Sequence, residues 1–377
     1  MTRGGGLEPF YSPERVAREA TLAEPSPRGE LLVVSCRSGT RLARAVVDRY
    51  RGLLAQERSH HRIDHLADID FQFSDTESCV RLERHVGGAD VFLFQSLLDL
   101  ASGRSVDENT VAFLLATDAC RTWGAAHVTA VLPYLTYARQ DKPTRDHREP
   151  TSARLMADLA LEAGIDRLVT VHPHIAHLPG LYGRIRVDAI SPLPYLVDAF
   201  QELRGRSDAI VVAPDVGASK LVADAAQALG LPAAIAVKAR PRAEEAVTAE
   251  LIGSFEGRRV ALVLDDMIAS GGTVRALLRR LAEETEVREV HLGVSHNLGL
   301  DIARERLLEL QADYGLVDVV VTDSVPQTEA FLELPFLRVV ELADVLARTL
   351  NRIHHDRPVS SLVREPEATA DRVEPVG

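Results

Sequence analysis

The sequence predicts an α/β protein of two similar domains, each with a mostly parallel sheet flanked by helices. With 377 residues, the chain is long enough for two domains with separate hydrophobic cores. Short apolar runs alternate with amphipathic stretches, which is typical of parallel strands connected by covering helices. The series pauses at residues 190–194, Ile-Ser-Pro-Leu-Pro, and then repeats. This repetition indicates two units of the same kind.

The expected elements follow the apolar runs. In the first domain we expect strands at 31–35, 91–94, 128–132 and 168–171, and helices at 41–51, 109–123 and 151–163. In the second we expect strands at 209–212, 233–237, 260–264, 290–294, 317–321 and 337–340, and helices at 219–229 and 274–284. We place the domains at 30–190 and 191–350, with the segment 351–363 packing on the first domain. Their composition predicts that the leader 1–29 and the tail 364–377 are disordered.

Composition limits the class of protein. Hydrophobic residues make up 46% of the chain and charged residues 26%, which is typical of a soluble globular protein. A net charge of −12 argues against sequence-independent nucleic-acid binding, which needs a basic surface. The sequence has neither an apolar run of membrane-spanning length nor a signal peptide. Three scattered cysteines without metal-type spacing predict a reducing, cytoplasmic location.

The stretch from Val260 to Thr273 carries the first functional signal. Five apolar residues, 260–264, predict a strand buried on both faces, and Asp265 and Asp266 follow at its end. The turn Ser270 to Thr273 then offers backbone N–H groups and hydroxyls at a helix N-terminus, which suits a phosphate group. Ligands of open parallel sheets bind at the carboxyl ends of the strands. We therefore expect a phosphate here, with a ribose diol or Mg²⁺ facing the two carboxylates.

A second signal follows the strand expected at 128–132. The segment 133–149 leaves this strand and is crowded with arginine and lysine, including Arg139 and Lys142. Such side chains neutralise polyphosphates, and arginine does so with a planar fork. Taken alone, the segment is more typical of a solvated surface loop.

Together these residues resemble known proteins. Asp265-Asp266 followed by Ser270-Gly271-Gly272-Thr273 resembles the phosphoribosyl-pyrophosphate loop of the type I phosphoribosyltransferase fold. Further segments, in the order that the family has them, resemble the ribose-phosphate diphosphokinases, also called phosphoribosyl-pyrophosphate synthetases. They are 72–77, 133–142, 148–153, 212–217, 238–241, 321–326 and 359–362, so the resemblance extends from residue 31 to about 363.

The resemblance implies an activity. These enzymes transfer the diphosphoryl group of ATP to the 1-hydroxyl of ribose 5-phosphate, giving 5-phosphoribosyl 1-diphosphate and AMP, with Mg²⁺ as cofactor. It also implies dimers, which can assemble into hexamers. Neither a nucleic acid nor a membrane is an expected partner. Phosphoryl transfer of this kind depends on positioning and charge stabilisation.

The family's functional residues can be matched one motif at a time. The resemblance implies that Lys238 and Arg240 are the catalytic cations of a flexible loop, and that His174 and Asp215 serve the metal. The implied ATP-binding residues are Phe73, Asp75, Glu77, Arg139, Gln140, Asp141 and His174, of which the first three hold the adenine of a neighbouring subunit. The implied ribose-5-phosphate site comprises Asp215, Asp265, Asp266, Ala269, Ser270, Gly271, Gly272 and Thr273.

Three positions depart from the family pattern and leave alternatives open. Ala269 and His172 each stand where many relatives have aspartate, and Ala239 stands where many have a basic residue. Ala269 and His172 fit a regulatory paralogue without activity, although Lys238 and Asp215 are retained. A phosphoribosyltransferase that consumes the same product is another alternative. The pair His172 and His174 also resembles the metal pair of amidohydrolases, a hypothesis that requires a (β/α)₈ barrel.

Overall fold

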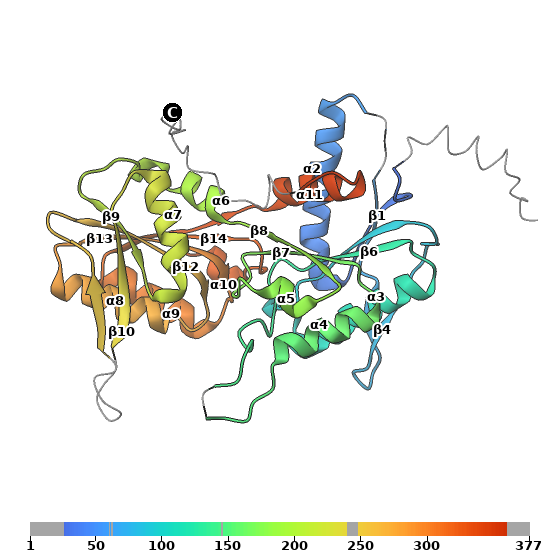
Figure 1. Cartoon of the computed structure of the whole chain (residues 1–377), viewed down its shortest axis with the longest axis horizontal. Helices are drawn as coiled ribbons and strands as arrows, with labels where there is room; N and C mark the ends of the chain where they lie inside the picture. The colour runs from blue at the N-terminus through green and yellow to red at the C-terminus, as the bar shows by residue number, and fades with distance from the viewer. Residues whose placement is uncertain (1–25, 60, 62, 145, 240–247, 360–377) are drawn as a thin grey trace, which may run out of the picture.

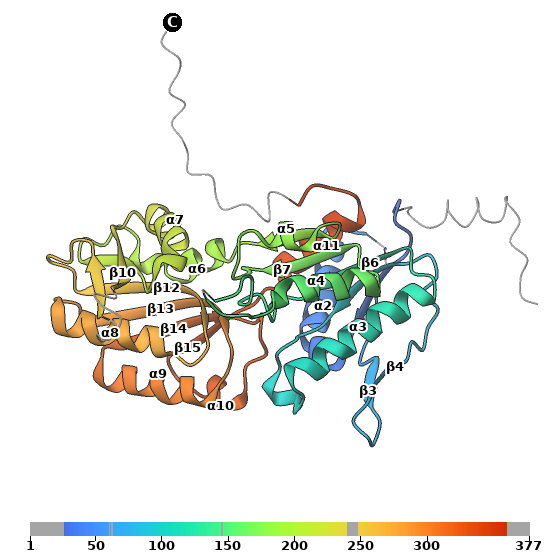
Figure 2. The same cartoon turned by 60° about the horizontal axis from the view of Figure 1, so that its bottom comes forward.

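The computed structural model describes residues 26–59, 61, 63–144, 146–239 and 248–359. It has two α/β lobes placed side by side, each built on its own sheet (Figures 1 and 2). The predicted fold class is confirmed. Two separate open sheets exclude a single (β/α)₈ barrel, so the amidohydrolase hypothesis is wrong.

The first sheet has six strands, all parallel, in the order β2-β1-β5-β6-β7-β8. Its strands are β1 Leu31–Ser35, β2 Asp64–Leu66, β5 Asp90–Phe94, β6 His127–Val131, β7 Arg167–Val171 and β8 Arg186–Ile190. The helices are α2 Thr40–Gln56, α3 Val106–Thr122, α4 Ser152–Ala163 and the short α5 Leu178–Tyr182. β1, β5 and β7 are buried along their whole length, because helices cover both faces.

A small antiparallel hairpin, β3 Asp70–Gln72 and β4 Ser78–Val80, stands outside this sheet. In Figure 2 it projects from the lobe beside α3.

The second sheet has seven strands in the order β11-β10-β9-β12-β13-β14-β15, parallel except for β11. Its strands are β9 Ala209–Ala213, β10 Ala233–Ala239, β11 Thr248–Ile252, β12 Val260–Ile268, β13 Glu289–Asn297, β14 Leu316–Thr322 and β15 Leu337–Val340. The helices are α6 Leu193–Ala199, α7 Ser219–Leu229, α8 Gly272–Glu284, α9 Asp301–Asp313 and α10 Glu329–Leu332. α8 and α9 pack on one face and α6 and α7 on the other.

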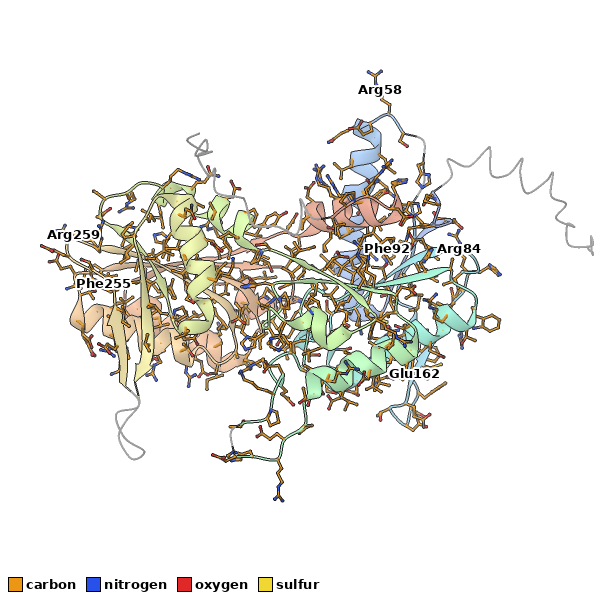
Figure 3. The ribbon with its side chains drawn as sticks, viewed as in Figure 1. Arg58, Arg84, Phe92, Glu162, Phe255 and Arg259 are labelled. Atoms are coloured by element: carbon orange, nitrogen blue, oxygen red, sulfur yellow. The ribbon has the colours of Figure 1, made fainter. Side chains whose placement is uncertain are left out.

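The chain finally returns to the first lobe. Helix α11, Ala343–His354, crosses α2 in Figure 1 and buries Leu346 and Leu350 in a shared core with Phe92, which Figure 3 labels. At its end, His354 Nδ1 lies 2.9 Å from Oδ2 of the buried Asp90. The last helix therefore fastens the second lobe to the first.

Sequence patterns located the central elements and missed peripheral ones. β12 extends to Ile268 instead of ending at 264, because its pairing with β13 continues through Asp265 and Ile268. The short edge strands β2, β8 and β11 and the polar helix α9 gave no clear periodic signal. Apart from residues 26–29, the predicted leader 1–29 lies outside the described residues, as does the tail 364–377. Within the described ranges, no helix is long and apolar enough to cross a membrane.

Asp323 connects the end of β14 to α11, and its ionisation should make stability depend on pH. Its Oδ1 accepts a hydrogen bond of 2.9 Å from the backbone N–H of Leu342, the N-cap residue of α11. Burial, with a smaller contribution from Glu341, raises the pKa of Asp323 to about 6, and the Leu342 N–H only partly opposes this. Because the folded pKa exceeds the ordinary value of 3.8, the folded state favours the neutral acid. Stability is therefore lost as pH rises from about 4 to about 6.

We predict that Asp323→Asn, which keeps an acceptor for Leu342 but has no charge, removes this loss. Its free energy of unfolding, measured by urea denaturation, should be equal to or lower than that of the wild type near pH 4. Above pH 6 it should be higher than that of the wild type. A difference between the two proteins that stays constant over this range would contradict the assignment.

Candidate active site

The carboxyl ends of the strands in the two sheets border one cavity of about 730 Å³. The first lobe contributes Arg139 and the segment 172–174 that follows β7, and the second contributes the segment 265–274. Asp215 and Lys220, from the turn after β9 and from α7, complete the polar lining. Residues more than 130 positions apart therefore meet where open parallel sheets bind ligands.

The segment 269–273 forms a tight turn between β12 and α8. Gly271, the N-cap of α8, has φ 75°, which glycine adopts without the strain that a side chain would bring. Arg306 of α9 supports the turn, because its Nη1 donates a 2.7 Å hydrogen bond to the carbonyl of Ser270. A Cβ added to Gly272 would lie 3.4 Å from the same Nη1. The turn thus places a helix N-terminus and a guanidinium next to each other, an arrangement that suits an anion.

Ala269 faces an apolar environment. It packs, with Met267, against a small cluster formed by Tyr134, Leu298 and Val325. On this side a methyl group packs where a carboxylate would find no polar partner within the cluster. The departure from the family pattern at this position is therefore compatible with its surroundings.

Three carboxylates give the cavity a strong negative charge. Burial raises the pKa of Asp265, and the charges of Asp266 and Asp215 raise it further. Burial alone would also raise the pKa of Asp266, but the hydrogen bond and charge of His174 lower it below its usual range. Asp215 directs Oδ1 to the backbone N–H of Gly217 at 2.8 Å. Oxygen donors that repel one another in this way suit Mg²⁺, so Asp215, Asp265 and Asp266 fit the cofactor that the family implies.

Two histidines of the first lobe reach across to the second. His174 Nδ1 is hydrogen-bonded to Oδ2 of Asp266, which raises the pKa of His174 although burial opposes this. His172, with φ 38°, directs Nδ1 to Oγ of Ser295 on β13 at 2.5 Å. The two imidazoles thus have different partners in the second lobe, and His172 contacts the scaffold beneath the cavity.

His296 of the second lobe contacts the backbone of His172 in the first lobe. Burial, strengthened by the charge of His172, lowers the pKa of His296 to about 4, so the ring is neutral near pH 7. Its Nε2 donates to the carbonyl of His172 at 3.1 Å, because a carbonyl can only accept. Nδ1 must then accept from the hydroxyl of Ser324 at 2.7 Å. We call the residues His172, Ser295, His296 and Ser324 the interlobe network.

The structure gathers most of the predicted site residues and leaves others apart. Arg139, His174, Asp215, Asp265, Asp266, Ala269, Ser270, Gly271, Gly272 and Thr273 all line the cavity. Gln140, next to Arg139 in the chain, bonds the first turn of α4. Its Oε1 accepts from Ser152 Oγ at 2.6 Å, and its carbonyl accepts from the backbone N–H of Ala153 at 3.2 Å. Asp141 Oδ2 lies 3.4 Å from His177 Nε2.

The predicted adenine-binding residues lie elsewhere, and the predicted catalytic cations fall largely outside the described residues. Phe73, Asp75 and Glu77 are exposed on the loop of the β3–β4 hairpin and do not belong to the described lining of the cavity. Half of the Phe73 surface, 51%, is accessible. The backbone of Lys238 belongs to β10 and pairs with Ala249, whereas its side chain and the whole of Arg240 lie outside the described part of the structure.

Sequence reasoning missed several residues of the site. Lys220 lines the cavity from α7, and Arg306 supports the turn from α9, 36 residues along the chain from Ser270. Ser295 and His296 lie within a strand that reads as ordinary buried β-structure. In the sequence, Lys220 is one charged residue among many. No local motif distinguishes Arg306, Ser295 or His296.

Comparison with known proteins agrees with this geometry. Residues 31–164 match the model for the N-terminal domain of ribose phosphate pyrophosphokinase, and residues 195–321 match the phosphoribosyl transferase domain. The ribose-phosphate pyrophosphokinase of Rhodopirellula baltica is 36% identical over 78% of this chain and 89% of its own length. That of Chromobacterium violaceum is 35% identical over 84% and 94% respectively.

A solved structure is similar over nearly its whole length. The crystal structure of phosphoribosylpyrophosphate synthetase from Mycobacterium smegmatis superposes with a TM-score of 0.74 and 29% identity, covering 87% of this chain and 99% of its own. Fold and cavity thus define a protein with two phosphoribosyltransferase-like domains and a ligand site between them. The chain belongs to the ribose-phosphate pyrophosphokinase family, and the predicted resemblance is confirmed.

The interlobe network should couple His172 and Ser295 energetically. In a double-mutant cycle, His172→Ala and Ser295→Ala should each lower the free energy of unfolding by about 1–3 kcal/mol. The first leaves the buried hydroxyl of Ser295 unpaired, and the second leaves a nitrogen of the half-buried His172 ring unpaired. The double variant should lose less than the sum, by roughly 0.5–3 kcal/mol. A control cycle pairs His172→Ala with Ser102→Ala, an exposed serine of the first lobe, and should be additive. Additivity in both cycles would contradict the coupling.

Proposed function

We propose that this protein is an active ribose-phosphate diphosphokinase, which transfers the diphosphate group of ATP to the 1-hydroxyl of ribose 5-phosphate and releases AMP. The observation that carries the proposal is the meeting of two half-sites in one cavity. The phosphate turn 269–273 comes from the second lobe, and Arg139 and His174 come from the first. A reaction between two phosphorylated substrates needs such a junction.

In this proposal the second lobe binds the sugar. The 5-phosphate lies in the turn at the N-terminus of α8. The hydrogen bond from Arg306 to the Ser270 carbonyl holds this turn in place. The ribose hydroxyls donate hydrogen bonds to Asp265 and Asp266, since ionised carboxylates can only accept. The 1-hydroxyl is thereby held facing the first lobe.

The first lobe binds the triphosphate of ATP. Arg139 offers its guanidinium to the phosphate oxygens, and His174 is oriented by Asp266 at the lobe boundary. Mg²⁺, held by Asp215 with His174 and the neighbouring carboxylates, would neutralise phosphate charge. Lys238 and Arg240 would close over the transferred group and stabilise the charge that develops on it.

The adenine contacts require a second copy of the chain. Phe73, Asp75 and Glu77 stand exposed on a projecting hairpin, where a neighbouring subunit can receive them. The adjacent helices α3 and α4 also expose Val111, Leu115, Leu155 and Leu159, two pairs spaced four residues apart. Both features support a dimer-based homo-oligomer, up to a hexamer. The three cysteines, all free in the described part of the chain, agree with a cytoplasmic location.

The test is the formation of AMP. Purified protein is incubated with ATP and Mg²⁺, with and without ribose 5-phosphate, and AMP is quantified. We expect AMP to form only when the sugar is present. Absence of sugar-dependent AMP would overturn the proposal. It would favour a regulatory paralogue, unless the protein consumes 5-phosphoribosyl 1-diphosphate in the presence of a nucleobase, as a phosphoribosyltransferase does.

Lys238→Ala should separate chemistry from binding. We expect kcat to fall by roughly two to four orders of magnitude, because a cation that stabilises only the transition state affects turnover and not ground-state affinity. ATP binding, measured by calorimetry, should change little. A variant with wild-type kcat would remove Lys238 from the mechanism.

Arg306→Gln should weaken sugar binding through the turn. Loss of its bond to the Ser270 carbonyl should raise the KM for ribose 5-phosphate about tenfold while leaving the KM for ATP within about twofold. Arg304→Gln is the matched control, because Arg304 on the same helix bonds the carbonyl of Ala330. Equal effects of both variants on the KM for ribose 5-phosphate would mean that substitutions in α9 act by destabilising the fold and not through the turn.

A further inference from the structure

A second cluster of potential ligands lies in the second lobe, away from the cavity. It comprises Glu202 in the short helix that follows α6, His291 on β13 and Asp318 on β14. His291 and Asp318 are neighbours across the two parallel strands, near the amino-terminal ends. The cavity lies at the opposite, carboxyl ends. One imidazole nitrogen and one oxygen from each carboxylate lie within 4.8 Å of one another.

The tautomer of His291 directs a lone pair into this cluster. Its Nε2 lies 2.9 Å from Oε1 of Glu289, and because an ionised carboxylate only accepts, Nε2 carries the proton of the neutral ring. Nδ1 is then the unprotonated atom. It is buried and has no hydrogen-bond partner among the residues that the structure describes. The residue as a whole is 8% exposed.

The distance from this nitrogen to Asp318 fits two ligands of one cation. Nδ1 lies 3.6 Å from Oδ2 of Asp318, beyond the roughly 2.7–3.2 Å of an N–H···O hydrogen bond. Two ligands bound to one tetrahedral ion at about 2.0–2.2 Å stand roughly 3.4 Å apart. A lone pair directed at a carboxylate is repulsive unless a positive charge lies between them.

The local charge also favours a cation. Glu202, Glu289 and Asp318 contribute three carboxylates. Arg338 pairs with Asp318, and Arg206, whose own partner is Asp208, interacts with Glu289. Arg338 Nε donates to Oδ1 of Asp318 at 2.9 Å and its Nη2 contacts Oδ2. Because Arg338 bonds both oxygens of Asp318, it favours the ionised form of that carboxylate.

We propose that Glu202, His291 and Asp318 bind one Zn²⁺ or a similar first-row divalent cation. An imidazole nitrogen with two carboxylates suits zinc better than Mg²⁺, which prefers oxygen alone. Glu289 is the outer carboxylate that orients the ligating histidine, and Arg338 orients Asp318 in the same way. The ion would tie the segment after α6 to β13 and β14, at the end of the sheet opposite the proposed active site.

The competing occupant is a proton. A protonated His291 would donate from Nε2 to Glu289 and point a second N–H at Asp318. Burial lowers the pKa of His291, and the neighbouring carboxylates raise it by more. Binding measurements must therefore distinguish an imidazolium held by carboxylates from a metal ligand.

The experiment measures Zn²⁺ binding by equilibrium dialysis in excess Mg²⁺, with Co²⁺ absorption as a second reporter of nitrogen ligation. Two variants remove ligands with little change of shape. His291→Gln keeps a donor for Glu289 but has no Nδ1, and Glu202→Gln changes one exposed oxygen. Glu283→Gln, an exposed acid on α8, removes the same charge elsewhere. His174→Ala removes the imidazole of the cavity.

We expect the wild type, Glu283→Gln and His174→Ala to bind one Zn²⁺ that Mg²⁺ does not displace, and to unfold at higher temperature with Zn²⁺. His291→Gln and Glu202→Gln should bind it at least tenfold more weakly. The proposal is overturned if His291→Gln binds like the wild type, or if only His174→Ala loses binding. It is also overturned if the wild type binds no Zn²⁺, and NMR that finds protons on both nitrogens of His291 at neutral pH would then identify the proton as the occupant.

Discussion

The contact between the two lobes at His172 and His174 is the constraint on which the cavity depends. Neither half-site is complete within one lobe, because Arg139 and the histidines follow strands of the first sheet and the acids follow strands of the second. Hydrogen bonds from neighbouring positions of one short segment reach Ser295 and Asp266. The distance between the half-sites is therefore set by a buried polar network instead of apolar packing alone. Such networks specify one arrangement, since an unpaired member is costly.

Charge distribution explains how an acidic protein can handle two phosphorylated substrates. The three carboxylates of the cavity lie at the strand ends of the second sheet, where burial and then their mutual repulsion raise the pKa of Asp265. Arg139 and Lys220 line the same cavity, and Arg306 supports the phosphate turn, so the cations come from three different elements. Substrate phosphates can thus be matched locally while the surface as a whole stays negative.

The departures from the family pattern have local physical explanations. Ala269 packs beside an apolar cluster, so the phosphate turn relies on backbone groups and on support from Arg306. His172 bonds Ser295, and it shares no ligand geometry with His174 that would resemble a hydrolase metal pair. Both positions line the cavity, and the three acids Asp215, Asp265 and Asp266 are retained beside them. Both are compatible with the activity proposed for the chain.

The sequence by itself determined the α/β class, the positions of the central strands and the half-sites that carry local motifs. Buried parallel strands are continuous apolar runs, and a phosphate turn is a contiguous segment, so both can be recognised locally. Asp265, Asp266 and the turn to Thr273 lie where the motif predicted, although β12 continues through both acids. Arg306, Ser295, His296 and the cluster around His291 carried no local signal. Only the tertiary structure assigned them, because their partners lie on other elements and hydrogen bonds across 30 or 120 residues leave no periodic trace in the chain.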